Sequence, residues 1–269
     1  MSAAVMQPLT AMRDAVRGAI RGVFADIDDT ISTGGRVTAE AYEAMERLRR
    51  SGLLVVPVTG RPAGWCDHIA RAWPVDAVVG ENGALYMIHD DRARKLIKRY
   101  AVGGAERQAA RARLMAVGEH IVRTEPGCAF ASDQPYREAD LAIDYCEDVA
   151  PLSREAVDRI AAVMRAEGMT AKVSSIHVNG WFGDYDKLTM TRLLLREEFG
   201  LDLDARRAEF VFVGDSPNDG PMFEFFPHSV GVANVRRFAD RLPAPPKYVT
   251  ARDAGAGFAE LADFLLEKG

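Results

Sequence analysis

Carboxylate side chains are concentrated in two short segments of this sequence, Asp26-Ile27-Asp28-Asp29-Thr30 and Gly214-Asp215-Ser216-Pro217-Asn218-Asp219. Either segment alone is also typical of a turn, since Asp, Asn, Gly, Ser and Pro all favour turns. Carboxylates that are brought together repel one another, and burial makes this repulsion costly. A hard divalent cation such as Mg²⁺ removes the conflict, because it prefers oxygen ligands. The segments therefore indicate a magnesium site if the fold brings them together.

The elements before these segments are those that would bring them together. Residues 22–27 and 209–213 are rich in apolar residues, a pattern typical of strands buried on both faces of a parallel sheet. A third such run, 53–58, ends in Thr59-Gly60-Arg61. In an open α/β sheet, ligands bind outside the carboxyl ends of the strands. The carboxylates and Thr59 are thus expected at one edge of the sheet.

The order of the remaining elements predicts a doubly wound, parallel, Rossmann-like α/β core that carries an inserted α+β cap. Helices are expected after Thr38 and Pro62 and over 186–200 and 258–267, with further strands at 77–79 and 229–233. Between them the pattern changes to helices within 105–120 and 153–168 and to amphipathic strands at 141–145 and 172–178. We therefore assign residues 1–84 and 185–269 to the core, and 85–184 to the cap.

Composition limits the classes of protein that are compatible with this sequence. The 269 residues carry a formal net charge of −5, which disfavours sequence-independent binding of nucleic acid. The three cysteines, Cys66, Cys128 and Cys146, are odd in number and widely spaced, so a disulfide framework or a zinc site is not expected. Without a secretory signal or an apolar run of membrane-spanning length, we expect a cytoplasmic protein, not bound to membranes, that is a monomer or a homodimer.

These motifs resemble the four signatures of the haloacid dehalogenase superfamily of phosphohydrolases. They are the segment that begins at Asp26, Val58-Thr59-Gly60-Arg61, Lys187, and the segment from Gly214 to Asp219. The size and position of the insertion match the large-cap subgroup, subclass IIB, which includes sucrose-phosphatase-like, mannosyl-phosphoglycerate-phosphatase-like and Cof-like enzymes. One departure concerns the residue after the lysine, which is usually Gly in the family and is Leu188 here, followed by Thr189.

The resemblance implies a phosphatase in which Asp26 is the nucleophile and Asp28 is the general acid and base. It implies Mg²⁺ as the cofactor, held by Asp26, the backbone carbonyl of Asp28, Asp215 and Asp219. The implied phosphate-binding residues are Thr59, Gly60, Lys187 and Asn218. Arg61 could also bind phosphate or could form an ion pair on the core.

The expected substrate is a small phosphomonoester, such as a sugar phosphate, whose leaving group contacts the cap. Candidate contacts there are Arg137, His177 and Asn179, the last two on one face of a predicted strand. Trp181 could stack on a sugar ring or pack beneath the cap.

Three other functions are compatible with parts of the pattern. A phosphosugar mutase is suggested by the likeness of residues 181–189 to phosphomannomutases, although the second acidic segment favours a phosphatase. A non-catalytic module that binds a sugar phosphate is disfavoured because every expected catalytic position is filled. A dehalogenase is disfavoured because that branch lacks the metal-binding pair Asp215 and Asp219.

Overall fold

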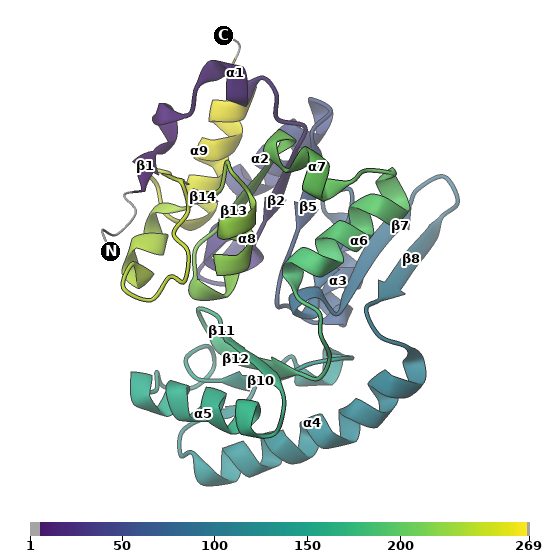
Figure 1. Ribbon diagram of the computed structural model, residues 1–269, viewed down its shortest axis with the longest axis vertical. Coiled ribbons are helices and arrows are strands. Elements are labelled where there is room, and N and C mark those ends of the chain that lie inside the picture. The colour runs from purple at the N-terminus through teal and green to yellow at the C-terminus, as the bar shows by residue number, and fades with distance from the viewer. Residues whose placement is uncertain (1–5, 268–269) are drawn as a thin grey trace.

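A six-stranded parallel sheet forms the centre of the larger part of the molecule in the computed structural model, which describes residues 6–267 (Figure 1). In spatial order its strands are β1 (Gln7–Pro8), β15 (Tyr248–Val249), β14 (Val230–Gly231), β13 (Phe210–Gly214), β2 (Gly22–Ala25) and β5 (Leu54–Pro57). All neighbouring strands in this sheet are parallel. The predicted fold class, a parallel α/β core, is confirmed.

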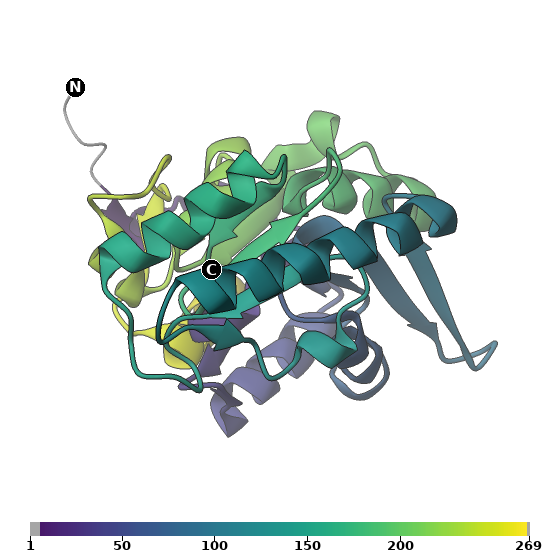
Figure 2. The same ribbon diagram turned by 90° about the horizontal axis from the view of Figure 1, so that it is seen from below.

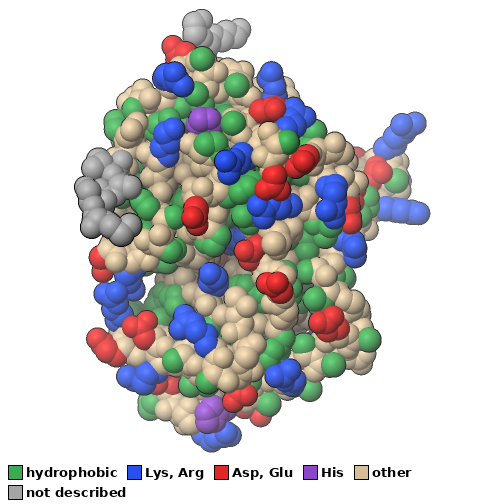
Figure 3. Space-filling view, in the orientation of Figure 1, with side chains coloured by type: hydrophobic (Ala, Val, Ile, Leu, Met, Phe, Trp, Pro, Cys, Tyr) green, Lys and Arg blue, Asp and Glu red, His purple; other side chains and the backbone are tan. Residues whose placement is uncertain are grey.

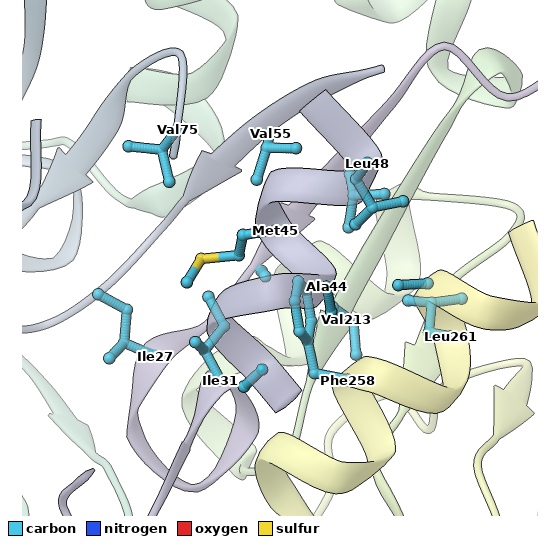
Figure 4. Packing of buried hydrophobic residues seen from close by; sticks show 14 of the residues in the cluster. Ile27, Ile31, Ala44, Met45, Leu48, Val55, Val75, Val213, Phe258 and Leu261 are labelled. Carbon is cyan, nitrogen blue, oxygen red and sulfur yellow. The ribbon is translucent and has the colours of Figure 1, made fainter. Parts of the chain in front are cut away.

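Consecutive residues of the central strands point to opposite faces of the sheet. Both faces therefore carry apolar side chains, and helices cover both. Val23 lies in a cluster with α2 (Ala39–Arg50), α3 (Ala63–Ala72) and α9 (Ala254–Leu266). Phe24 lies in a second cluster with α6 (Lys187–Phe199) and α8 (Gly220–Phe225). Figure 4 shows the first cluster, in which side chains of α2 pack between the sheet and α9. These two apolar layers hold β2 and β13 in the interior of the protein.

A three-stranded antiparallel sheet of β6 (Val78–Gly80), β7 (Leu85–Asp90) and β8 (Lys95–Tyr100) lies beside β5. An isolated parallel bridge between Val58 and Val79 continues the main sheet into β6. Leu85 and Met87 of β7 belong to the same apolar cluster as α2 and α3. The hairpin of β7 and β8 thus packs with the core, and we propose that the cap unit starts after it rather than at residue 85.

The inserted unit is an antiparallel sheet covered by two helices on the side away from the core (Figures 1 and 2). Its elements are α4 (Gly104–Thr124), β9 (Ala129–Phe130), β10 (Leu141–Asp144), α5 (Arg154–Ala166), β11 (Thr170–Val173) and β12 (His177–Trp181), and the strand order is β11-β12-β10-β9. The prediction of a single strand over 172–178 was wrong. The turn at Ser174 divides this segment into two antiparallel strands, because Ser174 Oγ accepts hydrogen bonds from the backbone N–H groups of Ile176 and His177.

The core also contains further short elements. They are α1 (Asp14–Arg17), the β3–β4 hairpin (Ser32–Thr33 and Arg36–Val37) and α7 (Leu203–Arg206). No helix within residues 6–267 combines the length and the apolar character needed to cross a membrane. Basic and acidic side chains are interspersed over the face shown in Figure 3.

Candidate active site

Three aspartates meet where β2 and β13 end. Asp26 follows β2, and its backbone N–H donates to Val213 O of β13 at 2.9 Å, so the two strand ends are held in register. Carboxylate oxygens of Asp26, Asp215 and Asp219 lie within 4.8 Å of one another, and all three residues are buried. A glycine is required at position 214, because a Cβ there would lie 2.3 Å from Asp219 Oδ2. The sheet edge thus gathers the predicted carboxylates into one cluster.

Lys187 enters this cluster from the N-terminus of α6. Its Nζ donates to Asp26 Oδ1 at 2.8 Å and to Asp219 Oδ1 at 2.7 Å. The close approach of α6 depends on Gly83, whose φ is +103° and where a Cβ would lie 2.0 Å from Asp186 O. The two carboxylates stabilise the ammonium, and they raise the pKa of Lys187 despite its burial.

The residues after Lys187 have a clear structural role. Asp186 caps α6, and its Oδ1 accepts from the Thr189 N–H at 2.7 Å, while Thr189 Oγ1 accepts from the Asp186 N–H at 2.8 Å. This reciprocal capping box satisfies backbone donors that the start of a helix leaves without partners. The departure from the family pattern at Leu188 and Thr189 therefore leaves Lys187 firmly positioned at the first turn of the helix.

One atom of the cluster indicates that a cation belongs there. Asp215 Oδ1 is buried and has no hydrogen-bond partner, whereas Asp215 Oδ2 accepts from Asn234 Nδ2 at 3.1 Å. Burial, together with the neighbouring charges of Asp26 and Asp219, raises the pKa of Asp215 well above its usual value. Burial likewise raises the pKa of Asp26 to about 8, even though Lys187 lowers it. An Mg²⁺ ion suits this donor set, because it would satisfy the free oxygen and offset the repulsion.

These pKa shifts predict how the stability of the metal-free protein depends on pH. Above pH ~4 an unfolded Asp releases its proton, whereas folded Asp26 keeps its own up to about pH 8, so the free energy of unfolding falls as pH rises through this window. The loss is at most ~1.4 kcal/mol per pH unit for each such group. Because an Mg²⁺ ion would bind the ionised carboxylates, it should stabilise the protein more at pH 8 than at pH 5.

Urea unfolding at pH 5, 6.5 and 8, in EDTA and in Mg²⁺, measures this dependence. The variant Asp26→Asn should show a flatter decline in EDTA, because it lacks one of the titrating groups. Stability that rises with pH in EDTA, or stabilisation by Mg²⁺ that is equal at all three pH values, would contradict the expectation.

The other three predicted phosphate-binding residues, Thr59, Gly60 and Asn218, lie in segments that follow strands β5 and β13. Thr59 is fully buried, and its Oγ1 accepts from the Arg61 N–H at 3.0 Å. Gly60 lies against the side chain of Asn82, which a Cβ at position 60 would approach to 3.1 Å. Asn218 is partly exposed in the 3-10 turn Pro217–Asp219 before α8, and its Oδ1 accepts from Ser216 Oγ. Their predicted role as phosphate ligands remains a proposal.

Asp28 lies outside the three-carboxylate cluster and pairs with Arg61. The guanidinium of Arg61 is 2.8 Å from Asp28 Oδ1 and 2.7 Å from Glu147 Oε1 of the cap. Glu147 also lies 2.8 Å from His177 Nε2. The neighbouring His177 ring and Arg61 guanidinium lower the pKa of Glu147 to about 2, although burial acts in the opposite direction. Arg61 thus forms an ion pair, one of the two roles considered for it, and this pair links the proposed acid to the cap.

The other two cap candidates belong to a second buried polar network. Arg137 donates to Asp133 Oδ1 and Asp140 Oδ1, both at 2.9 Å, and to the backbone carbonyl of Gly60 at 2.8 Å. Asn179 Nδ2 donates to Asp140 Oδ2 at 3.3 Å. Both side chains are buried at the contact between cap and core. In this structure Arg137 and Asn179 hold the cap against the core. Their contact with a substrate stays a proposal.

Trp181 packs beneath the cap, the second of its two considered roles. Only 1% of it is exposed, it stacks on Tyr185 with ring centroids 5.9 Å apart, and its indole N–H donates to Tyr185 O.

Glu81 is the main anchor of the cap that sequence reasoning missed. Its carboxylate is fully buried and accepts hydrogen bonds from the backbone N–H groups of Ala63 in the core and of Glu138, Ala139 and Asp140 in the cap. Burial and the charge of Asp140 raise its pKa to about 7. Its position directly after the predicted strand at 77–79 was a signal, because polar groups at strand ends line the functional edge of such sheets.

Asn234, Glu147 and Asp140 were also missed. Asn234 follows a strand end, as Glu81 does, and it donates to both Asp215 and the Asp29 carbonyl. Glu147 and Asp140 lie among several acidic residues of the cap, and no local pattern distinguishes those that pair with Arg61 and Arg137.

Comparison with known proteins agrees with this fold. A family model for haloacid dehalogenase-like hydrolases matches residues 23–103, which include Asp26, Asp28 and Thr59. A search of curated protein sequences found no match. The matched segment covers about a third of the chain, so the N-terminal part of the core is similar to haloacid dehalogenase-like hydrolases.

Several solved structures share the fold across nearly the whole chain. A Thermoplasma acidophilum protein superimposes with a TM-score of 0.68 at 18% identity, covering 91% of this chain and 98% of that one. The sucrose-phosphatase of Synechocystis, solved with sucrose and phosphate, gives 0.62 at 16% identity, with coverages of 91% and 98%. The C-terminal domain of the C. albicans trehalose-6-phosphate phosphatase gives 0.67 at 11% identity, with coverages of 96% and 98%. At these identities the likeness concerns the fold.

Proposed function

We propose that this protein is an Mg²⁺-dependent phosphatase that hydrolyses a small phosphomonoester through an aspartyl-phosphate on Asp26. The observation that carries this proposal is the cluster of Asp26, Asp215 and Asp219 around the Lys187 ammonium, with one carboxylate oxygen free to bind a cation. These are the groups that phosphoryl transfer to a carboxylate requires: a nucleophile, positive charge and a cation site.

In the first step, a carboxylate oxygen of Asp26 attacks phosphorus, and the bond from phosphorus to the leaving oxygen breaks. Asp28 gives its proton to that oxygen, so the alcohol leaves neutral. Lys187 binds non-transferred phosphoryl oxygens, and Thr59, the Gly60 backbone and Asn218 complete the phosphate site. Lys187 acts as a point charge here, and its burial strengthens the interaction.

In the second step, Asp28 takes a proton from a water molecule whose oxygen attacks the same phosphorus. The bond between phosphorus and Asp26 breaks, which releases inorganic phosphate and restores the Asp26 carboxylate. When bound by Asp26, Asp215, Asp219 and the Asp28 carbonyl, Mg²⁺ supplies positive charge that offsets repulsion between the phosphate and the nucleophile.

The polar side chains of the cap favour a small polar substrate such as a sugar phosphate. The core-facing side of β12 carries His177 and Asn179, and their partners Glu147 and Asp140 supply further hydrogen-bonding groups at the same interface. The phosphatases with this fold named above act on sucrose- and trehalose-derived phosphates by their titles. We therefore propose sugar phosphates as the first substrates to test with this protein.

Incubation with a panel of hexose and disaccharide phosphates tests the proposal. We expect Mg²⁺-dependent release of inorganic phosphate from at least one of them. Transfer of the phosphoryl group to another hydroxyl of the sugar without release would instead indicate a mutase. Binding of these compounds with neither release nor isomer exchange would indicate a non-catalytic module.

A further inference from the structure

The Arg61 guanidinium connects the proposed proton donor, Asp28 of the core, to Glu147 of the cap. Its Nε donates to Asp28 Oδ1 at 2.9 Å and to Oδ2 at 3.1 Å, and its Nη2 lies 2.8 Å from Oδ1. Toward the cap, Nη2 donates to Glu147 Oε1 at 2.7 Å and Nη1 to Oε2 at 3.4 Å. Contacts from two nitrogens fix the orientation of a carboxylate as well as its position. The orientation of the Asp28 carboxylate therefore depends on Arg61 and, through it, on Glu147.

Arg61 itself has little freedom to move. Only 3% of the residue is exposed, and its guanidinium lies 4.4 Å from the centre of the Trp65 ring. Its Nη1 also lies 3.4 Å from Asp133 Oδ2. A planar guanidinium that stacks on an aromatic ring and is held by several carboxylates keeps one orientation. Arg61 can therefore transmit the position of Glu147 to Asp28.

The cap holds Glu147 through the loop that follows β10. Asp144, buried at the end of β10, accepts hydrogen bonds from the backbone N–H groups of Glu147 and Asp148, both at 2.8 Å. The side chain of Glu147 also lies 2.8 Å from His177 Nε2 on β12. Glu147 is thus fixed to the cap sheet. Because Arg61 belongs to the core, the contact between them exists only while the cap lies against the core.

A separate set of contacts holds the cap against the core. Glu81 accepts hydrogen bonds from backbone N–H groups of both parts, and Arg137 donates to a backbone carbonyl of the core. These contacts do not involve Asp28, whereas the bridge through Arg61 ends directly on its carboxylate. The bridge is therefore not required for docking of the cap, and its position points to a role in the chemistry.

From this geometry we propose that Arg61 and Glu147 are positioning residues that aim the Asp28 carboxyl group at the leaving oxygen when the cap is closed. Oδ1, which has two contacts to Arg61 below 3 Å, is the oxygen that Arg61 holds. Oδ2 carries the proton that passes to the leaving oxygen, and it accepts a proton from water in the second step. The inference rests on the proposed phosphatase function and adds two residues to its proton transfers.

Two small esters that differ in their need for a proton test the proposal. Benzyl alcohol leaves poorly unless it is protonated, whereas 4-nitrophenol is much more acidic and leaves as an anion. The ratio of kcat/KM for benzyl phosphate to kcat/KM for 4-nitrophenyl phosphate therefore measures proton transfer in the first step. Neither ester carries a sugar hydroxyl that Glu147 could bind. We expect Glu147→Ala to lower this ratio roughly 10-fold or more, since general acids contribute ~10²-fold or more and small misplacements are costly.

Three further variants make the ratio specific. Arg61→Lys keeps the charge but loses the planar fork, so it should lower the ratio as Glu147→Ala does. Asp28→Asn removes the proposed acid and should lower it at least as much. Glu119→Ala is the control, because it makes the same substitution at an exposed position of α4, on the side of the cap away from the core, and should leave the ratio unchanged. Both esters are measured on one sample, so a partly unfolded variant does not alter the ratio.

The outcomes separate this proposal from the phosphatase function. Suppose that Asp28→Asn lowers the ratio, while Glu147→Ala and Arg61→Lys reduce both kcat/KM values equally or not at all. The positioning role is then overturned, and the phosphatase stands. If the wild-type protein releases phosphate neither from these esters nor from the sugar phosphates, the phosphatase proposal fails and this one fails with it.

Discussion

The variant Asp26→Asn is expected to reduce phosphate release by at least ~10⁴-fold, because removal of a nucleophile leaves only binding and electrostatic effects. The amide has nearly the shape of the carboxylate, and it relieves repulsion with Asp215 and Asp219, so the variant should remain folded. Steady-state phosphate release with the best substrate from the panel, together with urea unfolding, measures both properties.

Asp263→Asn provides a matched control for this experiment. Asp263 lies on α9, pairs with Arg47 at the surface, and is far in sequence from the site. Its replacement removes the same charge but should leave activity unchanged. If Asp26→Asn retained phosphate release within about ten-fold of the wild type, Asp26 would not be the nucleophile.

Replacement of Asp215 by Asn is expected to raise the Mg²⁺ concentration for half-maximal activity by ~100-fold or more. Even residues that only support metal ligands change affinity by ~10–100-fold, so loss of a ligand should have at least that effect. In EDTA at pH 8, the same variant should be more stable than the wild type, because it lacks a buried carboxylate whose pKa is raised by burial and by Asp26.

Titration of activity with Mg²⁺, and urea unfolding in EDTA, measure these two effects. They differ in sign, so a general loss of structure in the variant cannot mimic them. An unchanged Mg²⁺ requirement would remove Asp215 from the cation site. Lower stability in EDTA at pH 8 would show that repulsion within the cluster is not what the cation relieves.

The sequence predicts the parallel core because its signals are local. No polar side chain interrupts residues 22–25 or 210–213, which fits strands covered by helices on both sides. Parallel strands must then place their carboxyl ends at one edge. The proximity of Asp26, Asp215 and Asp219 therefore follows from the strand assignments together with this rule.

In the cap, local sequence patterns predict the strands' faces but not which side chains pair with one another. Alternation along β12 places His177 and Asn179 on one face, as expected, and the pairing of β12 with β10 agrees with this. Their partners are 30 or more residues away in sequence, and many acidic residues of the cap could have filled those positions. The network around Arg61 and Arg137 is therefore a product of tertiary packing, which periodicity does not encode.

The hairpin of β7 and β8 could not be assigned from sequence for a related reason. These residues were assigned to the cap, because a strand pattern does not specify which sheet a strand joins. The choice depends on Leu85 and Met87, which pack against the core cluster beside α3.

Trapping of the phosphorylated enzyme tests the central claim most directly. Borohydride reduces an aspartyl-phosphate to homoserine, and mass spectrometry of the peptides locates it. During turnover with Mg²⁺, we predict homoserine at position 26, and none when EDTA replaces Mg²⁺. Modification at another residue, or an equal yield in EDTA, would contradict the proposal that Asp26 accepts the phosphoryl group within a cation-bound cluster of aspartates.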